Sequence, residues 1–235
     1  MAQPPGDVVS SELPDARAGS RGSRIALAGF VFCGLFVVAW VLLRDSPSFD
    51  ATEGELLAYY GDPDMRRGSM VAGLFLVPLA SIAFIWFMAA LRDRYLVAAV
   101  RENTILSTAH VVAGVLVVTS LFTLAATELA VVWLAEEGDP LDVGAARSIL
   151  ALGAAMADIM ALRSAAVFVG VSATRAVRSG LFPRSYGVLS FLTALALLFI
   201  YEVQPWVTLL FPVWVAGSSV LILLRRHAVG LVEGA

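Results

Sequence analysis

The sequence contains few of the residues on which metal and redox chemistry depend. Its 235 residues include one cysteine, two histidines and no lysine, and only 15% are charged. The single thiol, Cys33, excludes an internal disulfide and a cysteine-based zinc site. His110 and His227 are far apart in the sequence, which argues against a bis-histidine haem or a three-histidine metal site within one chain. We therefore expect no metal and no other cofactor.

The shortage of charge is matched by an excess of apolar residues. Hydrophobic residues make up 59% of the chain and the mean hydropathy is +0.84, whereas a soluble domain is about 45–50% apolar and about 25% charged. A soluble fold of this length cannot hide so much apolar surface. The composition predicts an integral membrane protein. All 16 basic residues are arginine, which, with heavy use of Ala, Val, Gly and Leu, suggests a GC-rich bacterial genome and hence a bacterial plasma membrane.

Six apolar blocks are long enough, or nearly so, to cross about 30 Å of hydrocarbon as helices. They predict an all-α polytopic bundle with six transmembrane helices. The third block could continue to Leu134, and Glu202, Gln204 and Pro205 indicate a tight hairpin between the last two. The predicted spans are Ile25–Leu43, Ser69–Leu91, Thr104–Ala126, Ser148–Val171, Ser185–Tyr201 and Trp206–Leu224.

Arginine placement predicts the orientation of these spans. With an even number of crossings and both ends inside, eleven arginines fall in inner segments and four in outer segments. Short cytoplasmic loops are enriched in arginine and lysine, so both termini are expected to be cytoplasmic. Residues 1–24 are rich in Pro, Gly, Ser, Asp and Arg and predict a disordered cytoplasmic tail. Residues 227–235 form a short second tail on this scheme.

The loop between the first two predicted spans carries a helix signal. Thr52 and Glu55 have the spacing of a capping box and are followed by apolar residues. They predict a short helix at the outer surface that ends near Gly61 and Pro63. The chain has no phosphate-binding loop, paired-cysteine motif, nucleophile elbow or basic-aromatic surface, so we expect neither an enzyme nor a nucleic-acid-binding protein.

Asp158 is an ionisable residue within a predicted span. Placing such a residue in lipid costs free energy, so it is the first candidate for a functional site. It lies about 21 Å from the inner end of the fourth span at 1.5 Å per residue. Thr119 and Thr123 share one face of the third span at nearly the same level, with Ser120 beside them. We expect the third and fourth spans to pack closely and Asp158 to bond to this threonine face, with its charge state left open.

Two further polar residues lie closer to the predicted inner boundary. Arg163 is about 140° around an ideal helix from Asp158, which places an ion pair between them poorly. It could instead extend to the cytoplasmic headgroups. His110 is shallower still, and both residues are expected to face the interface or a cytoplasmic cavity. These two complete a candidate intramembrane polar site of Asp158, Thr119, Thr123, Ser120, Arg163 and His110.

This candidate site is compatible with two functions. The residues could join helices, which predicts a non-enzymatic structural or accessory membrane module. Its partners would be the lipid bilayer together with another membrane protein subunit or a second copy of the chain. Alternatively, the residues could line a polar path, which predicts a transporter or channel-like protein for a small solute, an ion or a proton. A dry interface between the third and fourth spans would favour the module.

Three segments carry a family resemblance. They read Trp86-Phe-Met-Ala-Ala-Leu-Arg92, Arg178-Ser-Gly-Leu-Phe-Pro-Arg184 and Phe211-Pro-Val-Trp-Val215. From Thr52 to Arg226 the chain resembles uncharacterised six-span membrane proteins of actinobacteria, in which an Arg-x-Gly-x-x-Pro-Arg turn often leads into the fifth span. The resemblance implies the six-span fold. It implies no activity and no functional residue.

Overall fold

The computed structural model describes residues 14–98, 104–137, 141–180, 182–200 and 206–233, and every regular element within them is helical. The all-α prediction is therefore confirmed for this part of the chain. In chain order the elements are α1 (Pro14–Leu43), α2 (Glu53–Gly61), α3 (Pro63–Val71), the π-helix η1 (Ala72–Leu76), α4 (Val77–Ala98), α5 (Thr104–Glu137), α6 (Val143–Ala155), the π-helix η2 (Met156–Ala161), α7 (Leu162–Ser179), α8 (Arg184–Phe199), the 3-10 helix η3 (Val207–Leu209) and α9 (Leu210–Glu233).

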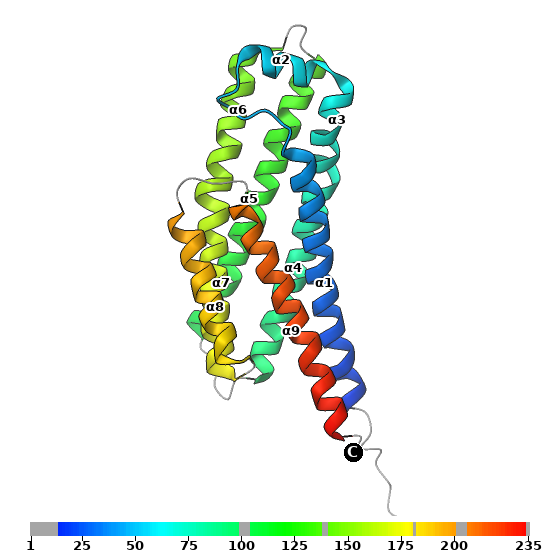
Figure 1. Ribbon diagram of the computed structural model, residues 1–235, viewed down its shortest axis with the longest axis vertical. Coiled ribbons are helices and arrows are strands. Elements are labelled where there is room, and N and C mark those ends of the chain that lie inside the picture. Colours follow the sequence, from blue (N-terminus) through cyan, green and yellow to red (C-terminus); the bar gives the residue numbers. More distant parts are fainter. Residues whose placement is uncertain (1–13, 99–103, 138–140, 181, 201–205, 234–235) are drawn as a thin grey trace, which may run out of the picture.

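The long helices stand side by side in an upright bundle, and α2 lies across its upper end (Figure 1). The beginning of α1 and the end of α9 lie together at the lower end, which is also where α4 ends, α5 begins and α7 turns into α8 (Figure 1). The two ends of the described chain thus share one side of the bundle. The predicted boundaries of the two tails change, because α1 begins at Pro14 and α9 continues to Glu233.

Five helical segments are long and apolar enough to cross a membrane. The predicted fifth span corresponds to α8, an apolar helix of 16 residues, whose length is about 24 Å at 1.5 Å per residue. Three of the five are longer than the sequence blocks suggested, because the helices continue past the apolar runs. The five segments are Ile25–Leu43, Pro63–Leu96, Thr104–Glu137, Val143–Ser179 and Val207–Leu224.

Two π-helices interrupt the long helices on either side of α5. The first, η1, precedes Pro78, whose missing amide cannot donate to the carbonyl four residues earlier. The second, η2, contains Asp158. Both pack against α5. Short π-helical segments inside α-helices occur frequently at functional sites. The part of α5 that contacts η1 and η2 is therefore a candidate location for a functional site.

The predicted capping box is present at α2. The Thr52 hydroxyl accepts a hydrogen bond from the Glu55 amide at 3.3 Å, and the Glu55 carboxylate accepts from the Thr52 amide at 2.7 Å. The helix ends at Gly61, and Pro63 then opens α3 at its first turn. The short surface helix predicted from the loop is therefore confirmed with its boundaries.

Two hydrophobic cores follow one another along the bundle. The larger core lies between the long helices and is centred on Phe84, whose ring centroid is 5.1 to 5.3 Å from those of Phe32, Phe168 and Phe211. The smaller core joins α2 to the upper ends of α5 and α6. We call the part around it, residues 44–71, 128–137 and 141–150, the cap. Its buried residues are Leu56, Tyr60, Val131, Val132, Leu141, Ala146 and Leu150.

Candidate functional site

The structure does not join Asp158 to the threonine face of α5. The hydroxyl of Thr119 donates to the Val115 carbonyl at 3.0 Å, and that of Thr123 donates to the Thr119 carbonyl at 2.9 Å. Ser120 likewise bonds within its own helix. Among the described residues no hydrogen bond links Asp158 to any of these hydroxyls. A hydroxyl in an apolar helix can satisfy itself on the carbonyl one turn earlier, which is why the expected contact is unnecessary.

Asp158 instead contacts Arg163. The Arg163 guanidinium donates to the main-chain carbonyl of Asp158. Asp158 lies in η2 and Arg163 lies just after it in α7, where the Leu162 amide donates to the carbonyl of Ala157 five residues earlier. The contact is with the main chain of Asp158, and among the described residues no ion pair joins the two side chains. The predicted poor placement of an ion pair between them is not contradicted.

The helix after Asp158 is longer than the predicted span. Helix α7 continues to Ser179, with Arg178 in its last turn, whereas the predicted span ended at Val171. Asp158 lies about 20 residues from Arg178, roughly 30 Å at 1.5 Å per residue. The predicted depth of Asp158 in a membrane stays a prediction.

His110 lies in a cluster at the lower part of the bundle that we call the inner polar cluster, formed by Tyr95, His110, Ser172 and Arg175. The His110 Nδ1 atom is 3.1 Å from the Ser172 hydroxyl, and its ring centroid is 4.4 Å from that of Phe168. His110 is completely buried. The expectation that it faces an interface or a cavity is wrong, because α4, α5 and α7 enclose it.

Two further contacts complete the inner polar cluster. The Tyr95 hydroxyl donates to the Ser172 carbonyl at 3.1 Å, and the Arg175 guanidinium lies 4.8 Å from the centroid of the Tyr95 ring. A cation over an aromatic face is attracted by the ring quadrupole, more strongly where water is excluded. Arg175 was predicted only as an inner-loop charge. It is in fact buried within α7, so that the cluster connects α4, α5 and α7.

A second, partly buried cluster lies within the cap, where α2, α3 and the α1–α2 connection meet α5, and sequence reasoning missed it. This outer polar cluster consists of Glu128 with Ser46, Tyr59, Tyr60 and Ser69. The Glu128 carboxylate accepts hydrogen bonds from the hydroxyls of Ser46 and Ser69. Ser46 is also 3.3 Å from the Tyr60 hydroxyl, and Tyr59 and Ser69 are 3.1 Å apart. A sequence signal did exist, because Glu128 is the sole acid in the apolar run from Thr104 to Leu134.

Charged residues around the cap also connect its helices to α5. Burial, together with the nearby Glu128 carboxylate, raises the pKa of Tyr60 above its ordinary value of 10.0, so its hydroxyl stays protonated. Arg66 donates to the Tyr60 carbonyl at 2.8 Å and lies 3.6 Å from the Glu136 carboxylate. Arg66 thus connects α3 with α2 and with the end of α5.

The helix contacts between these clusters are close. A Cβ atom at Gly153 would lie 2.5 Å from the Thr127 hydroxyl, and one at Gly73 would lie 2.8 Å from Leu129. Small residues allow helices to approach in this way. Among the described residues, no three His, Cys, Asp or Glu side chains converge as a metal site. The arrangement is suited to holding helices together.

Comparison with protein-family models, with curated proteins and with solved structures gives no match. The class of the protein therefore follows from its own fold. In its described residues the chain is apolar and all-helical, with five helices of membrane-spanning length, which is typical of a membrane-embedded protein. The resemblance to six-span actinobacterial proteins stays a prediction.

Proposed function

We propose that this chain is a six-span protein of a bacterial plasma membrane that acts as a non-enzymatic structural or accessory module. On this proposal α8 crosses together with α9 as a hairpin, and both termini are cytoplasmic. The cap faces outward and offers a folded surface to another membrane protein or to a second copy of the chain. The bundle itself anchors and positions the cap.

The close packing of α5 against α6 is the observation that carries this proposal. At the level of the cap junction, Thr127 is buried against Gly153, and its hydroxyl bonds to the Leu124 carbonyl at 2.8 Å. The hydroxyls of Thr119, Ser120 and Thr123 likewise bond to main-chain carbonyls of α5. A transport path would require polar groups that face an opening. We find no observation that favours the transporter, and we do not propose it.

The distribution of arginine supports the orientation. In the described parts of the chain, the segments at the lower end of the bundle carry ten arginines, and the cap side carries four. The common position of the two chain ends supports an even number of crossings (Figure 1). Six crossings with α8 satisfy both observations, whereas five would separate the ends.

Cysteine labelling tests this topology. In a Cys33→Ser background, Ser179→Cys should react with a membrane-impermeant maleimide only in inverted vesicles, and Asp62→Cys only in intact cells. Both side chains are accessible or partly accessible at opposite ends of the bundle. Reaction of both cysteines from the same side would refute the six-span arrangement.

The module function is tested by what the cap binds. Native purification followed by crosslinking from the exposed cap residue Asp62→Cys should capture one defined membrane partner or a dimer of the chain. Asp158→Asn should leave that capture unchanged. A solute, ion or proton flux through reconstituted protein that Asp158→Asn abolishes would contradict the module and establish a transporter.

A further inference from the structure

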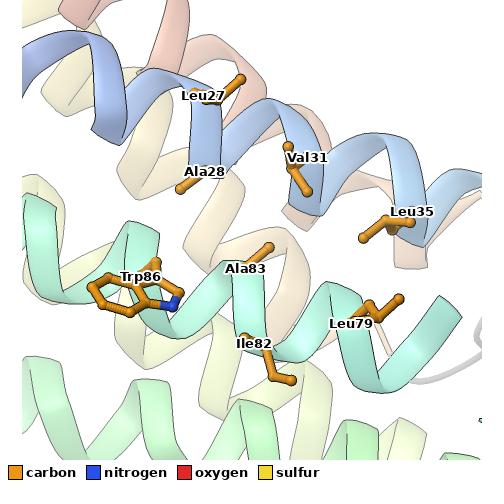
Figure 2. Close-up of a pocket in the computed structure, with 8 residues that line it drawn as sticks. All are labelled: Leu27, Ala28, Val31, Leu35, Leu79, Ile82, Ala83 and Trp86. Atoms are coloured by element: carbon orange, nitrogen blue, oxygen red, sulfur yellow. The ribbon is translucent and has the colours of Figure 1, made fainter. Parts of the chain in front are cut away.

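An apolar groove runs between α1 and α4 on the outside of the bundle (Figure 2). Its volume is about 520 Å³. Ala28 and Ala83 form its floor, because their short side chains leave space between the helices, and Ala83 is only 9% exposed. Larger side chains form its walls, and Trp86, 68% exposed, stands at one end. The wall residues are Leu27, Val31, Leu35, Leu79, Ile82 and Trp86.

The groove lies within one leaflet of the proposed membrane. From Leu27 to Leu35 it extends about 12 Å along α1 at 1.5 Å per residue, less than half of the roughly 30 Å hydrocarbon layer. Its lower end, at Leu27 and Trp86, is directed toward the beginning of α1 and the end of α4. That is the end at which the arginine-rich segments lie.

Three arginines continue the line of the groove along α1. Helix α1 is continuous from Pro14, and Arg17, Arg21 and Arg24 are spaced by four and three residues. The same alternation leads from Arg24 to Ala28, Val31 and Leu35, so the arginine positions fall on the face of α1 that forms the groove. The nearest acidic residue of α4 at this end is Asp93. Three arginines on α1 against one aspartate on α4 give this end of the groove a net positive charge. An apolar groove that ends in such charge suits a molecule with an apolar tail and an anionic head.

We propose that the groove is a binding site for an anionic phospholipid of the cytoplasmic leaflet. One acyl chain lies along Ala28 and Ala83. The phosphate lies at the level of Arg21 and Arg24, where basic residues next to a membrane helix attract anionic headgroups. Trp86 lies at the headgroup boundary, a level that amphipathic aromatic rings favour. This goes beyond the proposed module function, and its assignment to the cytoplasmic leaflet rests on the orientation proposed above.

Lipid retention measures this site directly and does not depend on the orientation of the chain. The purified full-length protein in mild detergent is incubated with phosphatidylglycerol or phosphatidylcholine of the same acyl composition, and bound lipid is counted by native mass spectrometry. We expect one tightly retained phosphatidylglycerol, with a preference over phosphatidylcholine of about fivefold for each arginine that contacts the phosphate. Equal retention of the two lipids would overturn the headgroup assignment.

The charge is tested with a matched pair of double variants. Arg21→Gln/Arg24→Gln should reduce the preference for phosphatidylglycerol to about one twenty-fifth of its wild-type value, because two basic residues next to the groove are removed. Arg178→Gln/Arg184→Gln removes the same charge from exposed positions at the same end but away from the groove, and should leave the preference intact. An equal loss in both double variants would show a diffuse charge effect and overturn the site.

The groove is tested with two single variants on exposed valines of α1. Val31→Trp fills the groove and should abolish retention of both lipids, whereas Val38→Trp lies outside the lining residues and should leave it unchanged. Inorganic phosphate, which has the charge without an acyl chain, should not raise the melting temperature of the protein. Unaltered retention in Val31→Trp, or stabilisation by inorganic phosphate, would overturn the groove. None of these outcomes bears on whether the cap binds a partner.

Discussion

The inner polar cluster, which is buried, and the outer polar cluster, which is partly buried, are constructed in different ways. In the inner polar cluster every member stands on a long helix, and the His110 ring packs at a tilt against Phe168 of the main core. In the outer polar cluster a single carboxylate, Glu128, stands on a long helix, and its partners come from the α1–α2 connection, α2 and α3. The inner cluster therefore depends on packing among α4, α5 and α7. The outer cluster depends on the cap being folded onto α5.

The difference between the two clusters indicates which part of the molecule unfolds locally most easily. Short elements with few buried contacts are the first to unfold locally, and the cap has a small core of its own. If the cap opens, Glu128 loses its hydrogen-bond partners. The outer polar cluster thus couples the folding of the cap to the bundle, whereas the inner polar cluster reinforces helices that are already closely packed.

Removing the Glu128 carboxylate gives the largest expected effect. Glu128→Ala leaves the hydroxyls of Ser46 and Ser69 without their acceptor and creates a cavity, which should lower the free energy of unfolding by about 3 kcal/mol. Thermal unfolding in detergent measures this, and faster tryptic cleavage after the exposed Arg67 reports loosening of the cap. Glu137→Ala, at the exposed end of α5, is the control and should change neither. Equal behaviour of the two variants would show that the outer polar cluster is not structural.

Truncating His110 should have a smaller effect that stays within the bundle. His110→Ala loses the hydrogen bond to Ser172 and the ring contact with Phe168, at a cost of about 2 kcal/mol. His110→Phe keeps a ring at this position and should recover about half of that loss. Tryptic cleavage after Arg67 should match the wild type in both variants. Accelerated cleavage in His110→Ala would show that the inner polar cluster also stabilises the cap, contrary to this prediction.

Enlarging Gly153 tests the close contact beside the cap junction. Gly153→Val forces a side chain onto Thr127, and overpacking of this kind should cost about 1.5 kcal/mol. Gly34→Val is the matched control, because a Cβ atom at Gly34 meets no atom within 4 Å. Differential scanning of the two variants in the same detergent gives the comparison. A loss in Gly34→Val as large as that in Gly153→Val would mean that helix propensity, and not close packing, determines the result.

The smallest effect is expected at the capping box of α2 and depends on pH. Hydrogen bonds from Thr52 lower the pKa of Glu55 below its ordinary value of 4.5. Because the carboxylate form is favoured in the folded state, its contribution is complete above the ordinary pKa and is lost as the pH falls through the lowered one. Amide hydrogen exchange in α2 should therefore gain protection relative to Glu55→Gln at pH 6 and lose that advantage below pH 4. Glu53→Gln, in the same turn but outside the capping box, should behave like the wild type.

Much of the helical framework could be predicted locally. The apolar blocks predicted the long helices, because a run of such residues with no charge has one stable arrangement in lipid. Thr52, Glu55, Gly61 and Pro63 predicted α2 with its boundaries, because capping and helix-breaking residues act on their own turn. The helices nevertheless extend beyond the apolar runs, since polar residues continue a helix once neighbouring helices support it.

The candidate site was less predictable because helix positions depend on exact periodicity. No partner was predicted for the Arg163 guanidinium within its own helix, and it bonds to the main-chain carbonyl of Asp158 at η2. Thr119 and Thr123 were expected to bond across helices, but their hydroxyls bond within α5. A single π-turn shifts every later residue on the helix surface, and the sequence carries no clear marker for it at η2.

The sequence by itself determined that the chain is apolar and helical and that arginine is concentrated in the segments at one end of the predicted spans. It also determined the capped helix α2. Only the tertiary structure decided that His110 is enclosed by α4, α5 and α7, that Glu128 meets hydroxyl groups of the cap, and that Ala28 and Ala83 leave a groove between α1 and α4. Hydropathy and capping are properties of neighbouring residues in one segment. Burial of a polar group, or a space between two helices, depends on which faces of distant segments meet.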